Sequence, residues 1–188
     1  MTVIYANHGD VDTLLLTRIW RGIEGVHVVE VTPSTENYEE LIADAIANEE
    51  DTLVICGHGT PAGLLHPILE RFEYLIHSLN YQDIRARNII GIWCHASEFA
   101  ELHHVNGFFT GMFISNINEA NRYGIFNVDE ATIHESEALF LDRVNRLLRE
   151  NVPLVEWNSR LRTQLNESHG VNDVDRYNYD HMAHFDFC

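Results

Sequence analysis

The stretch LVICGHGTP, residues 53–61, is an apolar run that ends abruptly on His58 and is followed by small turn-forming residues. A second stretch, IIGIWCHAS at residues 89–97, has the same form and ends on Cys94. Short, continuously apolar runs are typical of strands in a parallel sheet that is covered on both faces. Ligand sites in such sheets lie beyond the carboxyl ends of the strands, so we expect His58 and Cys94 to meet at that edge.

Apolar strands alternate with helical patterns along most of the chain. We expect strands at residues 2–6, 26–31, 52–57, 88–93 and 108–115. Helical periodicity predicts helices at about 10–22, 34–50, 67–79, 96–104, 118–124, 135–151 and 152–166. This alternation is typical of the α/β class, here a three-layer sandwich with a mostly parallel sheet between two layers of helices. The segment 167–188 has no clear period.

Composition narrows the range of partners. The 188 residues include 29 Asp and Glu against 12 Lys and Arg, a formal charge of −17, which disfavours binding to nucleic acid or to an anionic membrane surface. No run of about 18 apolar residues is present, so no membrane span is expected, and the N-terminus lacks the pattern of a signal peptide. An odd number of cysteines, Cys56, Cys94 and Cys188, favours free thiols in a reducing compartment, and we expect a cytoplasmic location.

A cysteine and a histidine at one sheet edge are suited to nucleophilic catalysis. The thiolate is the attacking species, and we expect the helix that follows Cys94 to favour it. His58 is suited to protonating the leaving amine, because the ordinary pKa of histidine is near neutrality. The backbone N–H groups of Gly59 and Cys94 are candidates for an oxyanion hole, since glycine lets a substrate carbonyl approach the main chain.

The ordered pair of strands, one ending in His-Gly and the next in Cys, resembles the caspase-like cysteine peptidases, a group that includes caspases, gingipains, clostripain, separase and the CHAT-domain proteases. GFFTGMFISNINEANRYG at 107–124 is similar to the next strand and helix of the group, and the segment at 137–162 resembles the helix pair that closes a CHAT-type domain. The resemblance implies a caspase-like domain over residues 1–166 with strand order 2-1-3-4-5, and a tail, 167–188, that packs on or near it. It also implies a Cys94–His58 dyad, a protein or peptide substrate and no cofactor.

Two residues beside the cysteine depart from the pattern of the group. Trp93 stands where many members have a small or polar residue, and His95 stands where glycine is commoner. We expect a bulky Trp93 to narrow the cleft. A catalytically inactive caspase-like module that binds protein partners is therefore the alternative hypothesis.

In the resembling families a charged pocket beside the dyad sets specificity. Asp10 and Asp12 follow the first strand and are placed to bind a basic side chain, although two acidic residues there also suit the start of a helix. The full set of candidate substrate-binding residues is Asp10, Asp12, His8, Ser115, Asn116 and Glu98, with Glu119 as a further acidic candidate. Cys56 lies within its strand, so we expect it in the core.

The remaining histidines do not predict a metal site. HASEF at 95–99 lacks the second histidine of the inverted zinc-protease pattern, and no H-E-x-x-H occurs. His181, His184 and Cys188 in the tail match no established zinc spacing. A nucleotide- or phosphate-binding protein of the same architecture is disfavoured, because the first strand ends in NHGD without a glycine-rich phosphate loop. The oligomeric state is left open.

Overall fold

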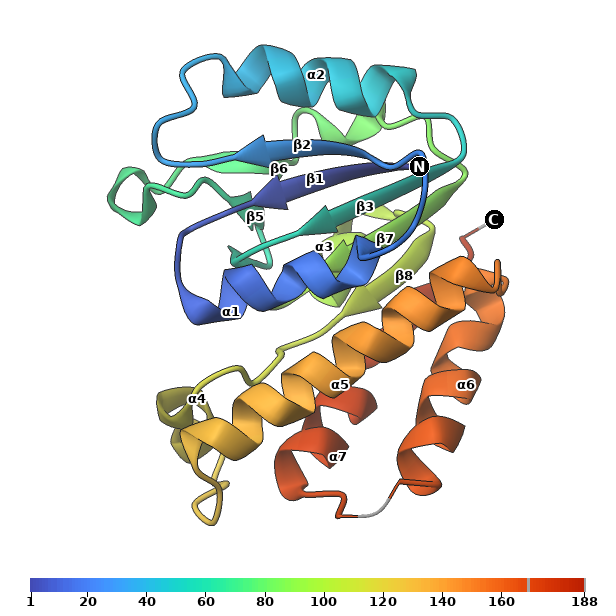
Figure 1. Ribbon diagram of the computed structural model, residues 1–188. Helices are drawn as coiled ribbons and strands as arrows, with labels where there is room; N and C mark the ends of the chain where they lie inside the picture. Colours follow the sequence, from blue (N-terminus) through green and yellow to red (C-terminus); the bar gives the residue numbers. More distant parts are fainter. Residues whose placement is uncertain (169, 188) are drawn as a thin grey trace.

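A six-stranded sheet runs through the computed structural model, which describes residues 1–168 and 170–187 (Figure 1). Its strands lie in the order β2-β1-β3-β7-β8-β9. Their bounds are Thr2–Ala6 for β1, His27–Val31 for β2, Thr52–Cys56 for β3, Asn88–Ile92 for β7, Gly107–Thr110 for β8 and Met182–Phe185 for β9. The first five in this order are parallel, and β9 runs antiparallel to β8. The predicted α/β class with a mostly parallel sheet is confirmed.

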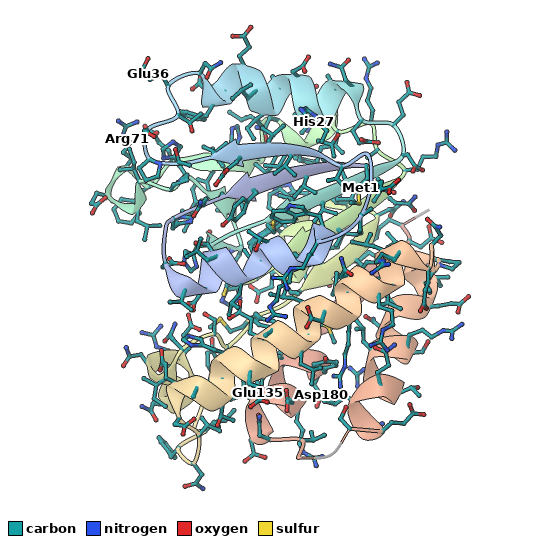
Figure 2. The ribbon with its side chains drawn as sticks, viewed as in Figure 1. Met1, His27, Glu36, Arg71, Glu135 and Asp180 are labelled. Atoms are coloured by element: carbon teal, nitrogen blue, oxygen red, sulfur yellow. The ribbon has the colours of Figure 1, made fainter. Side chains whose placement is uncertain are left out.

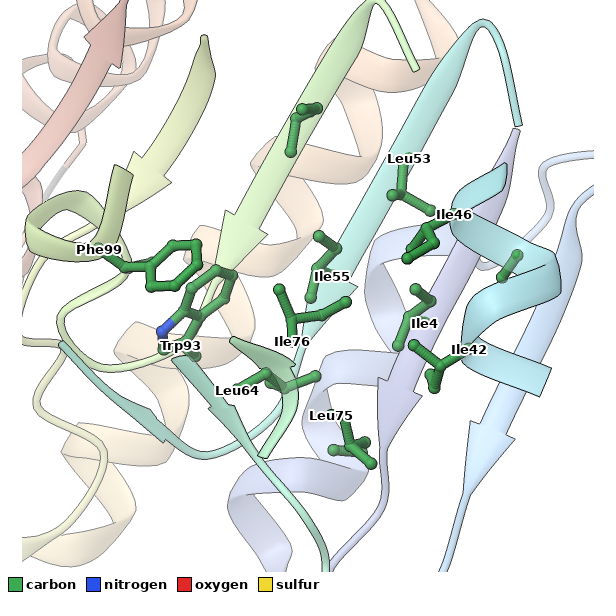
Figure 3. Packing of buried hydrophobic residues seen from close by; sticks show 14 of the residues in the cluster. Ile4, Ile42, Ile46, Leu53, Ile55, Leu64, Leu75, Ile76, Trp93 and Phe99 are labelled. Carbon is green, nitrogen blue, oxygen red and sulfur yellow. The ribbon is translucent and has the colours of Figure 1, made fainter. Parts of the chain in front are cut away.

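Helices cover both faces of the sheet. Their bounds are Val11–Leu15 for α1, continued by a 3-10 turn at Leu16–Trp20, Tyr38–Asn48 for α2, Ala96–His103 for α3, Ile117–Arg122 for α4, Glu130–Arg149 for α5, Leu154–Asn166 for α6 and Asp173–Asp180 for α7. Successive side chains of a strand point to opposite faces. Ile4 and Ile55 therefore pack with α2 and α3 in one core (Figure 3), while Val3 and Val54 pack with α5 and α6 in the other.

The first four strands lie within one residue of the predicted bounds, but the fifth is shorter than predicted. β8 ends at Thr110 instead of residue 115. After Thr110 the backbone forms hydrogen bonds outside the sheet. The amide of Gly111 donates to the carbonyl of His181 at 2.6 Å. The amide and the carbonyl of Ile114 both form hydrogen bonds with the side chain of Asn178. Residues 111–115 therefore leave the sheet as an apolar loop, although their sequence suits a strand.

The helix predicted at 67–79 is wrong. A small antiparallel sheet occupies this region, formed by β4 (Gly59–Thr60), β5 (Gly63–Leu65) and β6 (Tyr74–His77), with 3-10 turns at Leu69–Arg71 and Tyr81–Asp83. The apolar residues that suggested a helix divide between two environments: Leu75 and Ile76 are buried, whereas Phe72 is 79% exposed and Leu79 is 82% exposed. The spacing of the apolar residues favours a helix, but the packing of β6 against β5 and α2 favours a strand and decides the structure here.

Several helix limits also differ from the prediction. The helix predicted at 34–50 begins at Tyr38, because Thr32 and Thr35 close a turn before it. α5 begins five residues earlier than predicted, where the side chain of Asp129 accepts a hydrogen bond from the amide of Thr132. The tail, which has no clear period, forms α7 and β9. Among the described residues, no helix is both long and apolar enough to cross a membrane.

Candidate functional site

A small cavity of about 40 Å³ lies where the parallel strands end. His58 follows β3 and Cys94 follows the neighbouring strand β7, and both line this cavity. Asp12 from α1, Ser115 from the loop after β8 and Glu137 from α5 also line it. A larger groove of about 810 Å³ lies between α2 and β6, but none of the candidate residues lines it. The structure thus brings the predicted histidine and cysteine to one site.

His58 is held by an acidic partner. Its Nε2 lies 2.7 Å from Oδ2 of Asp10, and the ring of His8 packs edge-on against it with the ring centroids 4.6 Å apart. Asp10 also accepts a hydrogen bond from the amide of Thr13 at 2.8 Å, so it caps α1 as well. Burial raises the pKa of Asp10, but the hydrogen bonds from Thr13 and His58 outweigh burial and leave that pKa below its ordinary value. Asp10 therefore carries a negative charge beside the imidazole.

The main chain before His58 requires glycine. Gly57 has a φ of 151°, and a Cβ at this position would lie 2.7 Å from the Cβ of Ala6. No side chain fits in that space or favours that φ. Gly57 thus lets the end of β3 pass close to β1, which places His58 near the loop that carries Asp10.

The surroundings of Cys94 do not stabilise the thiolate, contrary to the prediction from the sequence. Its Sγ donates a weak hydrogen bond to the carbonyl oxygen of Phe113 at 3.4 Å. Burial, followed by the nearby carboxyl groups of Glu119, Glu137 and Asp12, raises the pKa of the Cys94 thiol to about 12. The helix that begins at Ala96 does not offset these effects, so the thiol is neutral at physiological pH.

Trp93 lies against Gly59 instead of standing in open solvent. The tryptophan is 2% exposed, and its Nε1 donates to the carbonyl oxygen of Thr60 at 3.3 Å. A Cβ on Gly59 would lie only 2.0 Å from Cδ1 of the indole. We expected the open side of Gly59 to receive a substrate carbonyl, but the indole occupies this space. Figure 3 shows Trp93 beside Phe99 in the core of that face.

Acidic groups surround the part of the cavity near Ser115. Oδ2 of Asp12 accepts a hydrogen bond from the Ser115 hydroxyl at 2.8 Å, and Glu119 accepts one from the Ser115 amide at 2.9 Å. Glu137 is 3% exposed, and its Oε2 is buried with no hydrogen-bond partner. Burial raises the pKa of Glu137 well above its ordinary value, and the negative charges of Asp12, Asp10 and Glu119 raise it further. His134 is the basic side chain that lies near these carboxyl groups. Its Nε2 is 3.6 Å from Oδ1 of Asp12.

Glu137 and His134 were not identified from the sequence, although a signal for Glu137 exists. In α5 the buried residues Ile133, Phe140 and Val144 recur at helical spacing, and Glu137 falls on the same stripe. A carboxylate on an apolar stripe is rarely buried without a partner or a function. The sequence does not predict that Glu137 and Cys94 line the same cavity, because this depends on how α5 crosses the sheet.

Other candidate residues lie outside the cavity lining. Glu98 pairs with His95 at 2.6 Å on the exposed side of α3, and Asn116 caps α4 by accepting a hydrogen bond from the Glu119 amide at 3.1 Å. Cys56 is fully buried in β3, as predicted, and burial raises the pKa of its thiol. Cys188 lies outside the described residues.

The histidines of the tail do not gather around a metal position. His181 stacks on Tyr177 with ring centroids 4.0 Å apart, and His184 belongs to β9. Within residues 1–168 and 170–187, no three His, Cys, Asp or Glu side chains lie close enough together to hold a metal ion.

Glu137→Gln is expected to change how stability depends on pH. The folded chain retains the Glu137 proton to a higher pH than the unfolded chain does, so the free energy of unfolding falls as pH rises between the ordinary and the raised pKa. One such group contributes a slope of up to about 1.4 kcal/mol per pH unit. Glutamine removes this contribution. Urea unfolding from pH 5 to 9 should therefore show the variant gaining stability relative to the natural protein as pH rises, and parallel curves would contradict a buried, protonated Glu137.

The site combines a thiol, an imidazole held by a carboxylate, and an acidic cavity beside them. These groups are sufficient for acyl transfer through a thioester, provided that the thiol becomes ionised. No protein-family model, curated protein or solved structure matches the chain.

Proposed function

We propose that the chain is a cysteine endopeptidase of the caspase-like group, with Cys94 as nucleophile and His58 as general acid and base. The observation that carries the proposal is that these two residues leave adjacent parallel strands, β7 and β3, and line one cavity at the carboxyl edge of the sheet. The order β2-β1-β3-β7-β8 supports it too, because these five parallel strands then follow the layout 2-1-3-4-5. The experiment that tests the proposal compares the cleavage of peptide substrates by the natural protein and by Cys94→Ala.

The proposed reaction begins with transfer of the thiol proton to His58. Asp10 engages Nε2 of the ring, so Nδ1 is the nitrogen left for this proton. The Cys94 side chain must first rotate away from the Phe113 carbonyl to reach the imidazole. Sγ then attacks the peptide carbonyl carbon, and the backbone N–H groups at Gly59 and Cys94 are proposed to stabilise the oxyanion after the Trp93 indole moves off Gly59.

Collapse of the tetrahedral intermediate breaks the peptide bond. His58 gives its proton to the leaving amine, and the acyl group remains on Sγ as a thioester. Water then attacks the thioester with His58 as the base, which releases the acid product and restores the thiol. Asp10 stabilises the imidazolium in both steps by its charge and fixes the orientation of the ring.

A binding module without catalytic activity is the second candidate function. The observations that favour it are the pKa of the Cys94 thiol, about 12, and the indole of Trp93 against Gly59. In that case the cleft binds a protein partner and no peptide bond is cut. A peptide that binds equally well to the natural protein and to Cys94→Ala and is cleaved by neither would favour this function.

Asp10→Asn is expected to lower kcat by about 10²-fold or more, because the imidazolium loses its charged partner. The asparagine still caps α1, so a loss of helix stability does not account for the effect. A positioning role also predicts that the pH profile of kcat/KM moves, which a purely structural role does not require. Asp142→Asn is a suitable control, since Asp142 lies outside the cavity lining and pairs with Arg18. Unchanged kcat and pH profile in Asp10→Asn would contradict the role.

A further inference from the structure

The cavity beside Cys94 has more carboxyl groups around it than basic side chains. Asp12 and Glu137 line it, and Glu119 reaches the same group through Ser115. No salt bridge joins Glu119 or Glu137 to a basic side chain among the described residues, and His134 is the basic residue that pairs with Asp12 there. Buried carboxylates in proteins are usually paired or hydrogen-bonded. With no basic side chain paired to it in the described part of the chain, Glu137 keeps its proton, and a cation that entered the cavity would take the place of this proton.

Glu137 is the position in the cavity at which a cation would bind. The side chain is 97% buried, since only 3% of the residue is exposed, and Oε2 has no hydrogen-bond partner although the residue lines the cavity. An unmade hydrogen bond at a buried carboxyl costs free energy. A donor that enters the cavity would make this bond and would meet Asp12 at the same time.

The size and walls of the cavity restrict the donor. A volume of about 40 Å³ accommodates roughly three water-sized groups. The terminal part of a lysine side chain, an ammonium with its last methylenes, is of this size, whereas a guanidinium is a broad planar group of four heavy atoms. Leu16, Ile92 and Leu141 line the same cavity and suit an aliphatic stem.

The composition of the chain offers independent support. Lysine is among the commonest residues of proteins, but none of the 188 residues is a lysine, and all 12 basic residues are arginines. Arg71 is 53% exposed in the loop between β5 and β6, which Figure 2 shows at the periphery of the molecule. Exposed loop tips are preferred sites of proteolytic cutting. A peptidase directed to arginine would find sites in its own copies, whereas one directed to lysine would find none in this sequence.

We propose that the acidic cavity formed by Asp12, Ser115 and Glu137 binds the ammonium group of a lysine side chain in a polypeptide, and that it selects lysine over arginine. The inference rests on the proposed peptidase function in one respect: the bound lysine is the residue whose carbonyl Cys94 attacks. The ammonium donates hydrogen bonds to Glu137 and Asp12, and its stem lies along the apolar wall. A bound lysine would also neutralise part of the negative charge that raises the pKa of the Cys94 thiol, so the correct substrate would promote its own attack.

Binding to Cys94→Ala tests the inference without catalysis. Labelled peptides that differ in one residue, lysine, arginine or norleucine, are titrated with this variant by fluorescence anisotropy. We expect the lysine peptide to bind at least about tenfold more tightly than the other two, the effect of one or two charge-assisted hydrogen bonds. Adding Glu137→Gln should reduce its affinity to that of the norleucine peptide. Glu135→Gln is the matched control, because Glu135 lies two residues away on α5 and is exposed (Figure 2).

The outcomes separate this inference from the proposed function. Equal affinity for the three peptides, or a lysine preference that survives Glu137→Gln, would overturn the lysine site even if the natural protein cuts peptides. A lysine preference that disappears with Glu137→Gln supports the site even if the natural protein cuts none of them. Cleavage after lysine by the natural protein, with arginine and norleucine peptides left intact, supports the site and the peptidase together.

Discussion

Cys94→Ala is expected to abolish peptide cleavage, with a loss in kcat/KM of at least about 10³-fold. Alanine removes the one atom that forms the covalent bond to the substrate and leaves the packing around the site almost unchanged. The measurement is cleavage of fluorogenic peptides that carry lysine, arginine, aspartate or leucine before the reporter group. The lysine peptide should give the largest difference between the two proteins.

Cys56→Ala provides the control for this experiment. Cys56 is the other cysteine that the structure describes, it is fully buried in β3, and it does not line the cavity. Its replacement should cost about 1 kcal/mol of packing and leave cleavage intact. If Cys94→Ala and the natural protein cleave every peptide at the same rate, Cys94 is not the nucleophile and the peptidase proposal fails.

Asn178→Ala is expected to lower the free energy of unfolding by about 2–4 kcal/mol. Asn178 is 3% exposed in α7, and its side chain makes two hydrogen bonds to Ile114: the Ile114 amide donates to Oδ1 at 2.7 Å, and Nδ2 donates to the Ile114 carbonyl at 3.0 Å. Alanine leaves both backbone groups buried without partners, and each such group costs about 1–3 kcal/mol. Urea denaturation of the purified variant measures the loss.

The same substitution should affect the site. Ile114 lies between Phe113, whose carbonyl accepts the thiol hydrogen of Cys94, and Ser115, which bonds to Asp12. Loosening this loop should weaken peptide binding as well as stability. Asn121→Ala is the comparison, because Asn121 is exposed on α4 and its loss should change stability by less than about 0.5 kcal/mol. A similarly small change in Asn178→Ala would show that α7 does not hold the loop.

The sequence predicted the structure correctly where a short run of residues is enough to define a strand. The four runs that form β1, β2, β3 and β7 were predicted to within one residue. A continuous buried apolar run, as in β1, β3 and β7, has few alternatives to a covered parallel strand, and the edge strand β2 has buried Val29 and Val31 on either side of exposed Glu30. The positions of His58 and Cys94 follow from the same pattern, since each is the residue at which such a run ends. The sequence was misleading at 67–79, where apolar spacing suits a helix but Leu75 and Ile76 pack in a strand that pairs with β5.

The amino-acid sequence by itself determined that a thiol and an imidazole stand at one edge of a parallel sheet, because strand ends are encoded by residues adjacent in the chain. Only the tertiary structure decided the state of that thiol. Its neutral form results first from burial and then from the nearby carboxyl groups of Glu119, Glu137 and Asp12, which come from α4, α5 and α1. The effect of each carboxyl group on the thiol depends on the distance between them in space. These distances are set by how the helices cross the sheet, and a local sequence pattern does not encode them.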